Sequence, residues 1–215
     1  MKPGFRRRIL VMIMGIVIMS MGVVLFKLSL MGNDPSTAMV MAIGDLAGID
    51  FSFILLGMNL LWFLVEWKWN KKLIGVGTFV NWFLVGPLAS AFDKLVRSVW
   101  IVPDIWGIRL LLMAAGVLVL SLSCALYQTS DVGIAPYDAL SISLSERTGK
   151  KYFGCRILTD TICALIAVSC GGVIGIGTLM CALGLGPFIQ FFSRSVAAPL
   201  VYGKGACSDT TFASN

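Results

Sequence analysis

The sequence predicts an all-α integral membrane protein with six transmembrane helices, arranged as two inverted-topology repeats of three helices. Three observations lead to this fold class. The 215 residues are 58% hydrophobic and only 13% charged, which is too few charges for the polar coat of a soluble domain. Apolar runs of membrane-spanning length recur along the chain. Finally, "IGVGTFVNWFLVGPLASAF" at 74–92 returns as "IGIGTLMCALGLGPFIQFF" at 174–192.

The first apolar run, Ile9–Phe26, follows Arg6, Arg7 and Arg8. A secretory signal peptide begins in the same way, but this run is long for one and no small-residue cleavage site follows it. We therefore interpret it as a retained first transmembrane helix.

Five further runs are long enough for a helix to cross a hydrocarbon layer about 30 Å thick, and none alternates as a barrel strand does. We expect these spans at about Phe51–Trp67, Ile74–Phe92, Ile108–Tyr127, Phe153–Cys170 and Gly172–Phe192. All spans belong to one membrane domain, 1–215, with repeat one at about 9–95, repeat two at about 108–195 and a cytoplasmic tail at 196–215.

Lysine and arginine mark the orientation. They gather at the N-terminus, after the second span, after the fourth span and at the chain end, so the positive-inside rule places both termini in the cytoplasm. Because these residues are dispersed among helix ends, the net charge of +6 does not indicate nucleic-acid binding.

The repeat extends to two short segments, Pro35–Ala47 and Pro136–Thr148, which are too short to span. Asp34 before a proline predicts a helix start, and Gly48 and Gly149 predict the stops. The second segment has an amphipathic pattern typical of an interfacial helix, with partial insertion as the alternative. Since each repeat has an odd number of spans, the second enters from the opposite face, as in many secondary transporters. Duplication also builds bundles without transport activity, and this alternative stays open.

Polar groups inside apolar helices are costly, so they are candidate functional residues. Arg156 and Asp160 are one helical turn apart and can form an ion pair, which could equally be purely structural. Asn59 occupies the equivalent place in the first repeat. The other candidates for binding a solute, or for bonding helices together, are Tyr137, Asp138, Thr78, Thr178, Asn81 and Gln190. Asp138 also suits the positive end of a helix dipole.

The repeated G-x-G-T and G-P motifs lack the lysine of a phosphate-binding loop. We interpret them as stripes of small residues where helices pack closely, followed by proline kinks. The residues concerned are Gly75, Gly77, Gly86, Pro87, Gly175, Gly177, Gly186 and Pro187.

The sequence has no histidine, and its six cysteines form no C-x-x-C pair, so we expect no metal site and no cofactor. Paired carboxylates, H-E-x-x-H and G-x-S-x-G are also absent from the sequence, and we expect that the protein is not an enzyme.

Together the motifs "GNDPSTAM", "IGVGTFVNWFLVGP", "VGIAPYDALSISLSERTG", "CRILTD" and "IGIGTLMCALGLGP" resemble the YczE/YitT-like family of bacterial integral membrane proteins. The resemblance covers most of the chain from about Gly22 to Phe192, and the second repeat is the closer match. In the first repeat Thr37 stands where the family more often has an acid. The resemblance implies a multispanning protein of the bacterial plasma membrane and brings no established activity.

Two functions follow from these observations. The first is a secondary transporter or solute-binding membrane subunit for a small polar or charged solute, with its site between the repeats. The second is an accessory or regulatory membrane protein that acts through a partner. The expected partners are the lipid bilayer and an unidentified solute, and a second copy or another protein remains open.

Overall fold

The computed structural model describes residues 4–49, 51–100, 103, 105–172 and 175–203, and every regular element in these ranges is helical. The elements are α1 (Phe5–Ser29), α2 (Pro35–Ala47), α3 (Phe51–Trp69), η1 (Lys71–Leu73), α4 (Val76–Val99), α5 (Trp106–Thr129), α6 (Pro136–Thr148), α7 (Tyr152–Ser169), α8 (Ile176–Phe192), η2 (Ser193–Ala197) and α9 (Ala198–Tyr202).

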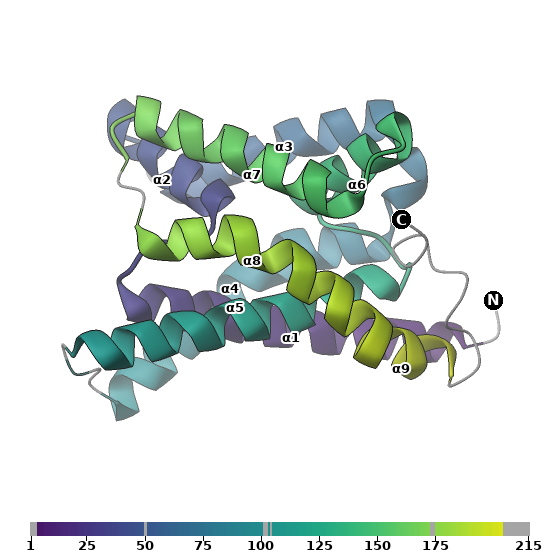
Figure 1. Ribbon diagram of the computed structural model, residues 1–215, viewed down its shortest axis with the longest axis horizontal. Helices are drawn as coiled ribbons and strands as arrows, with labels where there is room; N and C mark the ends of the chain where they lie inside the picture. The colour runs from purple at the N-terminus through teal and green to yellow at the C-terminus, as the bar shows by residue number, and fades with distance from the viewer. Residues whose placement is uncertain (1–3, 50, 101–102, 104, 173–174, 204–215) are drawn as a thin grey trace.

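The helices form two layers. Figure 1 shows α2, α3, α6 and α7 in the upper layer, α1 and α5 in the lower one, and both α4 and α8 passing from the middle of the molecule into the lower layer. The most extensive packing is that of α1 on α5. The short helix α2 packs on α7, and the short helix α6 packs on both α3 and α7. Each short helix therefore contacts a long helix from the other half of the chain.

The exterior is apolar. Four helical stretches in the described residues are long and apolar enough to cross a membrane: α1, α5, α7 and the continuous stretch Ile176–Tyr202. Large apolar side chains also face outward from α3, α4 and α8, among them Phe53, Leu64, Phe83 and Leu183. A soluble monomer rarely exposes so much apolar surface. The chain is therefore a helical membrane protein, while its six-span arrangement stays a prediction because α3 and α4 are not among the four.

Both short helices have the predicted bounds. The Asp34 side chain accepts a hydrogen bond from the Thr37 backbone N–H at 3.1 Å, which caps the first turn of α2. Gly48 and Gly149 end α2 and α6 with φ angles of 65° and 66°, in the left-handed region that glycine adopts without strain. The capping prediction is confirmed.

α6 is largely buried between α3 and α7, so its serines do not face water as those of a surface helix would, while its position at the interface or partly inserted stays a prediction. Two of its three serines bond inside the protein rather than to water, whereas Ser143 Oγ is buried with no hydrogen-bond partner among the described residues. Ser141 Oγ lies 2.9 Å from Thr159 Oγ1, and Ser145 Oγ donates to the Lys150 carbonyl at 2.7 Å. Buried serines with partners carry little penalty, so they imitate the polar face of a surface helix.

The last helix is longer than expected. Beyond Phe192 the chain continues through the π-helical turn η2 into α9, so the stretch 196–202 is helical and packs on the bundle, while the cytoplasmic location of the tail 196–215 stays a prediction. Tyr202 Oη donates to the Thr129 carbonyl at 3.2 Å and accepts from Arg8 Nη2 at 2.9 Å. Residues 204–215 lie outside the described residues.

The G-x-G-T motifs pack a helix start against a loop. The Gly77 N–H donates to the Val132 carbonyl at 3.0 Å, and the Gly177 N–H donates to the Met31 carbonyl at 2.9 Å. A Cβ on Gly75 would overlap the Val132 carbonyl, and a Cβ on Gly175 would overlap that of Met31. Close packing is thus the reason for these glycines, but the partner is a loop of the other half of the chain rather than a helix.

The glycines of the two G-P motifs, Gly86 and Gly186, have different surroundings. Gly86 in α4 has open space where a Cβ would be, so close packing does not require a glycine there. Gly186 in α8 lies against the Phe153 ring. Pro87 and Pro187 lie inside α4 and α8, as predicted.

Candidate functional site

Arg156 is the centre of a buried charge cluster. Its side chain projects from α7 and is only 4% exposed. Nη1 donates to Asp138 Oδ1 on α6, and Nε lies 3.4 Å from Asp160 Oδ2, one turn further along α7. Asp138 and Asp160 are 6% and 0% exposed. One guanidinium therefore holds two carboxylates from two helices.

Tyr137, next to Asp138 on α6, closes the cluster from the other side. Its hydroxyl donates to Asp160 Oδ1, and its ring lies 4.9 Å from the Arg156 guanidinium, in cation–π contact. The ring of Trp62 on α3 packs beside Tyr137, with the centroids 6.3 Å apart. We call Tyr137, Asp138, Arg156 and Asp160 the Arg156 cluster.

The bonding within the Arg156 cluster is incomplete. Arg156 Nε and Asp160 Oδ2 are close enough for an ion pair, yet neither has a hydrogen-bond partner among the described residues. Buried charges usually bond all their donors and acceptors, because each unmet group costs free energy. The cluster therefore retains hydrogen-bonding capacity that a polar solute could use.

Glu66, near the end of α3, is a further buried acid. It is 1% exposed, and neither carboxyl oxygen has a hydrogen-bond partner in the described part of the chain. It lies within reach of the negative charge of Asp138. Glu66 is therefore a third buried acid in the described interior, next to the two that bind Arg156 in the Arg156 cluster.

The other predicted candidates lie outside the Arg156 cluster's bonding network. Thr78 is fully buried, and its Oγ1 accepts from the Gly75 N–H at 3.2 Å, which caps α4. Thr178 is buried, and its Oγ1 has no hydrogen-bond partner among the described residues. Asn81 Nδ2 lies 3.4 Å from Met19 Sδ. Asn59 and Gln190 are half-buried, and neither side chain makes a hydrogen bond to another described residue.

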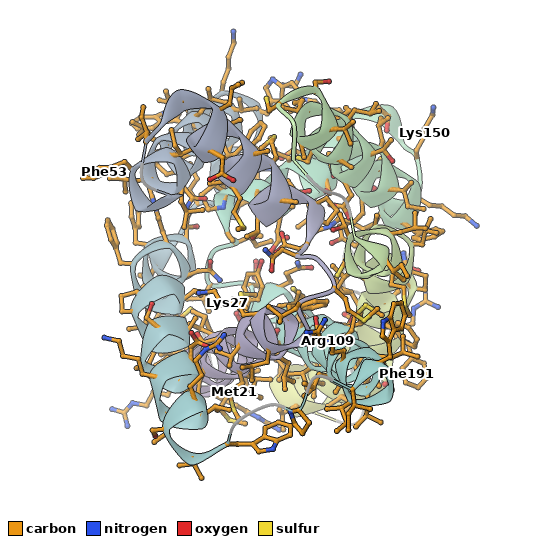
Figure 2. The ribbon with its side chains drawn as sticks, turned by 90° about the vertical axis from the view of Figure 1, so that its left-hand side faces the viewer. Met21, Lys27, Phe53, Arg109, Lys150 and Phe191 are labelled. Atoms are coloured by element: carbon orange, nitrogen blue, oxygen red, sulfur yellow. The ribbon has the colours of Figure 1, made fainter. Side chains whose placement is uncertain are left out.

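A separate cavity of about 490 Å³ opens where α1 ends and α2 begins. Polar and charged side chains from three elements line it, including Lys27, Asn33, Thr37, Asp93 and Arg97. Arg97 Nε lies 2.9 Å from Asp93 Oδ1, so the charges of these two residues neutralise each other. Lys27 adds a positive charge to the lining of the cavity. Figure 2 views the molecule from this end, with Lys27 between the two layers.

Sequence reasoning found the members of the Arg156 cluster but not all of their contacts. The turn spacing indicates the Arg156–Asp160 pair, and Asp138 is predicted as a candidate solute-binding residue that also suits a helix dipole. Its contact with Arg156 is not predicted, because that contact joins two separate helices, α6 and α7. Glu66 was missed. Its signal is an acid inside "LLWFLVEWKW", which the adjacent Trp67 and Lys68 make look like an ordinary interfacial end.

An apolar exterior around a buried arginine–carboxylate cluster defines the class as a helical membrane protein with charged groups in its interior. The chain belongs to the family of unknown function DUF6198, whose model matches residues 6–194. It is 25% identical over 191 residues to an uncharacterised protein of Haemophilus influenzae, covering 89% of this chain and 85% of that protein. No solved structure matches the chain.

Proposed function

We propose that the protein is a secondary transporter, or the solute-binding membrane subunit of one, for a small polar or charged solute. The proposal includes six spans in two inverted repeats. It includes no catalytic step and no cofactor.

Matched contacts between the two halves support the repeat. Leu30 and Asp131 both have a φ of 52°, and Gly32 and Gly133 follow with φ of 114° and 128°. The packing of α2 on α7 corresponds to that of α6 on α3, and the packing of α1 on α4 corresponds to that of α5 on α8. Inverted repeats with short or broken helices near their interface are typical of secondary transporters.

The observation that carries the proposal is the position of Arg156. A guanidinium and two carboxylates lie buried inside a membrane protein, where ionisable groups are costly and often mark the path of a solute or ion. The free-energy cost of burying these charges is explained if a solute or ion binds to them and replaces the bonds between Arg156 and the two carboxylates.

The direct experiment is a solute screen on the purified chain in detergent. Amino acids, vitamins, nucleosides and organic acids are tested for thermal stabilisation, and the active compounds are tested for uptake into reconstituted vesicles. A compound that both stabilises and accumulates supports transport. No stabilising compound together with no uptake would contradict it and favour an accessory protein that acts through a partner.

Asp160→Asn is expected to abolish uptake of any solute found in this way. The amide preserves size but removes the carboxylate to which Arg156 and Tyr137 are bound, so the Arg156–Asp160 ion pair is lost. Initial uptake rates in vesicles measure the effect. Asp45→Asn, at an exposed position near the end of α2, is the control and is expected to transport normally. Undiminished uptake by Asp160→Asn would rule out an essential charge at this position.

The topology makes an independent prediction for a plasma-membrane protein with both termini in the cytoplasm. In a variant without native cysteines, Asn33→Cys is expected to react with an impermeant maleimide added to intact bacteria, because its loop faces outward in the inverted arrangement. Lys151→Cys is expected to react only after the cells are opened. Reaction of Asn33→Cys only in opened cells would overturn the inverted topology.

A further inference from the structure

We propose that Glu66 is a proton-binding site which remains protonated in the resting protein and is the coupling site of the proposed transporter. Its coupling role depends on the proposed function, whereas the binding of a proton does not. Nothing in the sequence motifs assigns a role to this residue.

The surroundings of the Glu66 carboxyl group favour its neutral form. Glu66 is 1% exposed, and both of its oxygens lack hydrogen-bond partners among the described residues. An ionised carboxylate in such a place would lose its hydration and gain no bonds in exchange, which costs far more than binding a proton. A neutral carboxylic acid is therefore the form that this site favours.

The charges on the neighbouring helix α6 also favour a protonated Glu66. On α6, Asp138 is the acid whose negative charge reaches Glu66, and it is already bound to Arg156. The other charged groups of α6 are directed elsewhere, because Glu146 accepts from Asn70 Nδ2 at 2.5 Å and the Arg147 guanidinium lies 5.1 Å from the Trp69 ring centroid. No positive charge compensates Glu66 in the described structure, so the proton is the cation that neutralises it.

The remaining elements packed against α3 do not alter this balance. On α4, whose Phe79 and Trp82 rings pack on Phe63, the charged residues all lie beyond Pro87, and Asp93 is paired with Arg97. Asp34 lies at the start of α2, where it caps the helix, and Asp45 near the end of α2 is exposed. In η1, the Lys71 ammonium lies 5.8 Å from the Trp67 ring centroid, and Lys72 is exposed. On α3 itself, Lys68 is exposed and two positions from Glu66, a spacing at which side chains do not face each other.

The consequence is coupling between Glu66 and the Arg156 cluster. Ionised Glu66, Asp138 and Asp160 would oppose a single guanidinium, leaving an excess of negative charge in the interior. A proton on Glu66 removes part of that excess. A solute that changes the pairing of Asp138 with Arg156 changes the field at Glu66, and with it the affinity of Glu66 for its proton.

The test treats the full-length protein in detergent with dicyclohexylcarbodiimide. This reagent reacts with protonated carboxyl groups in apolar surroundings. We expect a covalent adduct that peptide mass spectrometry places on Glu66, with a yield that falls from mildly acidic to alkaline pH and does not change when sodium chloride is added. Glu66→Gln is expected to lose this adduct, and the control Glu146→Gln is expected to keep it.

Two results would overturn the inference: no adduct on Glu66 at mildly acidic pH in folded protein, or an adduct that sodium abolishes, which would identify a metal cation as the bound species. Mapping the adduct on the unmodified sequence keeps the test valid even if Glu66→Gln does not fold. The labelling needs no transported solute. Labelling of Glu66 without uptake of any solute would contradict the transporter function but support the proton-binding site. Uptake of a solute without labelling of Glu66 would contradict the proton-binding site but support the transporter function.

Discussion

Replacing Arg156 with leucine is expected to destabilise the protein by about 3–5 kcal/mol, because Asp138 and Asp160 would stay buried with no cation to bind. Thermal unfolding in detergent should show a melting temperature lower by roughly 10 °C. The melting temperature of Arg156→Lys is expected to lie between those of Arg156→Leu and the unmodified protein. One ammonium cannot reproduce a guanidinium that contacts two carboxylates through different nitrogens.

The matched control removes all the charges together. Arg156→Leu combined with Asp138→Asn and Asp160→Asn leaves no buried charge uncompensated, so it should regain most of the lost stability. If the triple variant is stable but binds no solute, the cluster serves binding rather than folding. A single Arg156→Leu variant as stable as the unmodified protein would contradict the ion pairs described here.

Local signals were the best predictors of the fold. The bounds of α2 and α6 followed from proline in the first turn and glycine after the last, because both residues act through their own backbone angles. The Arg156–Asp160 pair followed in the same way from the spacing of one helical turn. Such features depend only on residues close in sequence.

Features that depend on tertiary packing were not predictable from the sequence. The contact of Asp138 with Arg156 joins two helices, and the burial of Glu66 depends on α6 covering α3. The buried serines of α6 imitated a surface pattern because their partners, Thr159 and the Lys150 carbonyl, lie outside the helix. In each case one sequence fits two environments, and the neighbouring helix decides between them.

The positions of the polar groups connect the fold to the proposed function. In a membrane protein, apolar surfaces facing lipid supply little of the force that holds helices together, so close packing and interior hydrogen bonds must do so. The Gly75 and Gly175 contacts provide close packing at the two helix starts, away from the Arg156 cluster's bonds. These glycine contacts do not involve the Arg156 cluster. The triple variant at Arg156, Asp138 and Asp160 can therefore test solute binding while the packing at the helix starts is kept.

Gly175→Ala is expected to destabilise the protein by about 3 kcal/mol, the upper part of the range for overpacking a dense site. The new Cβ would overlap the Met31 carbonyl, and the Gly32 Cα lies just beyond it. These are backbone atoms, which cannot move aside as a flexible side chain can. Relieving the overlap would also stretch the 2.9 Å hydrogen bond from the Gly177 N–H to Met31. Chemical unfolding in mixed micelles measures the loss.

The comparison that isolates packing uses Gly57→Ala, in the middle of α3, where a Cβ meets nothing within 4 Å. There alanine is expected to be neutral or to stabilise by about 0.5–1 kcal/mol, because it loses less conformational entropy in a helix. Gly75→Ala should resemble Gly175→Ala, since its Cβ would overlap the Val132 carbonyl. Gly175 has a φ of −88°, which alanine adopts freely, so any loss at this position comes from lack of space and not from backbone strain. Equal stability of Gly175→Ala and Gly57→Ala would show that the helix start does not contact this loop.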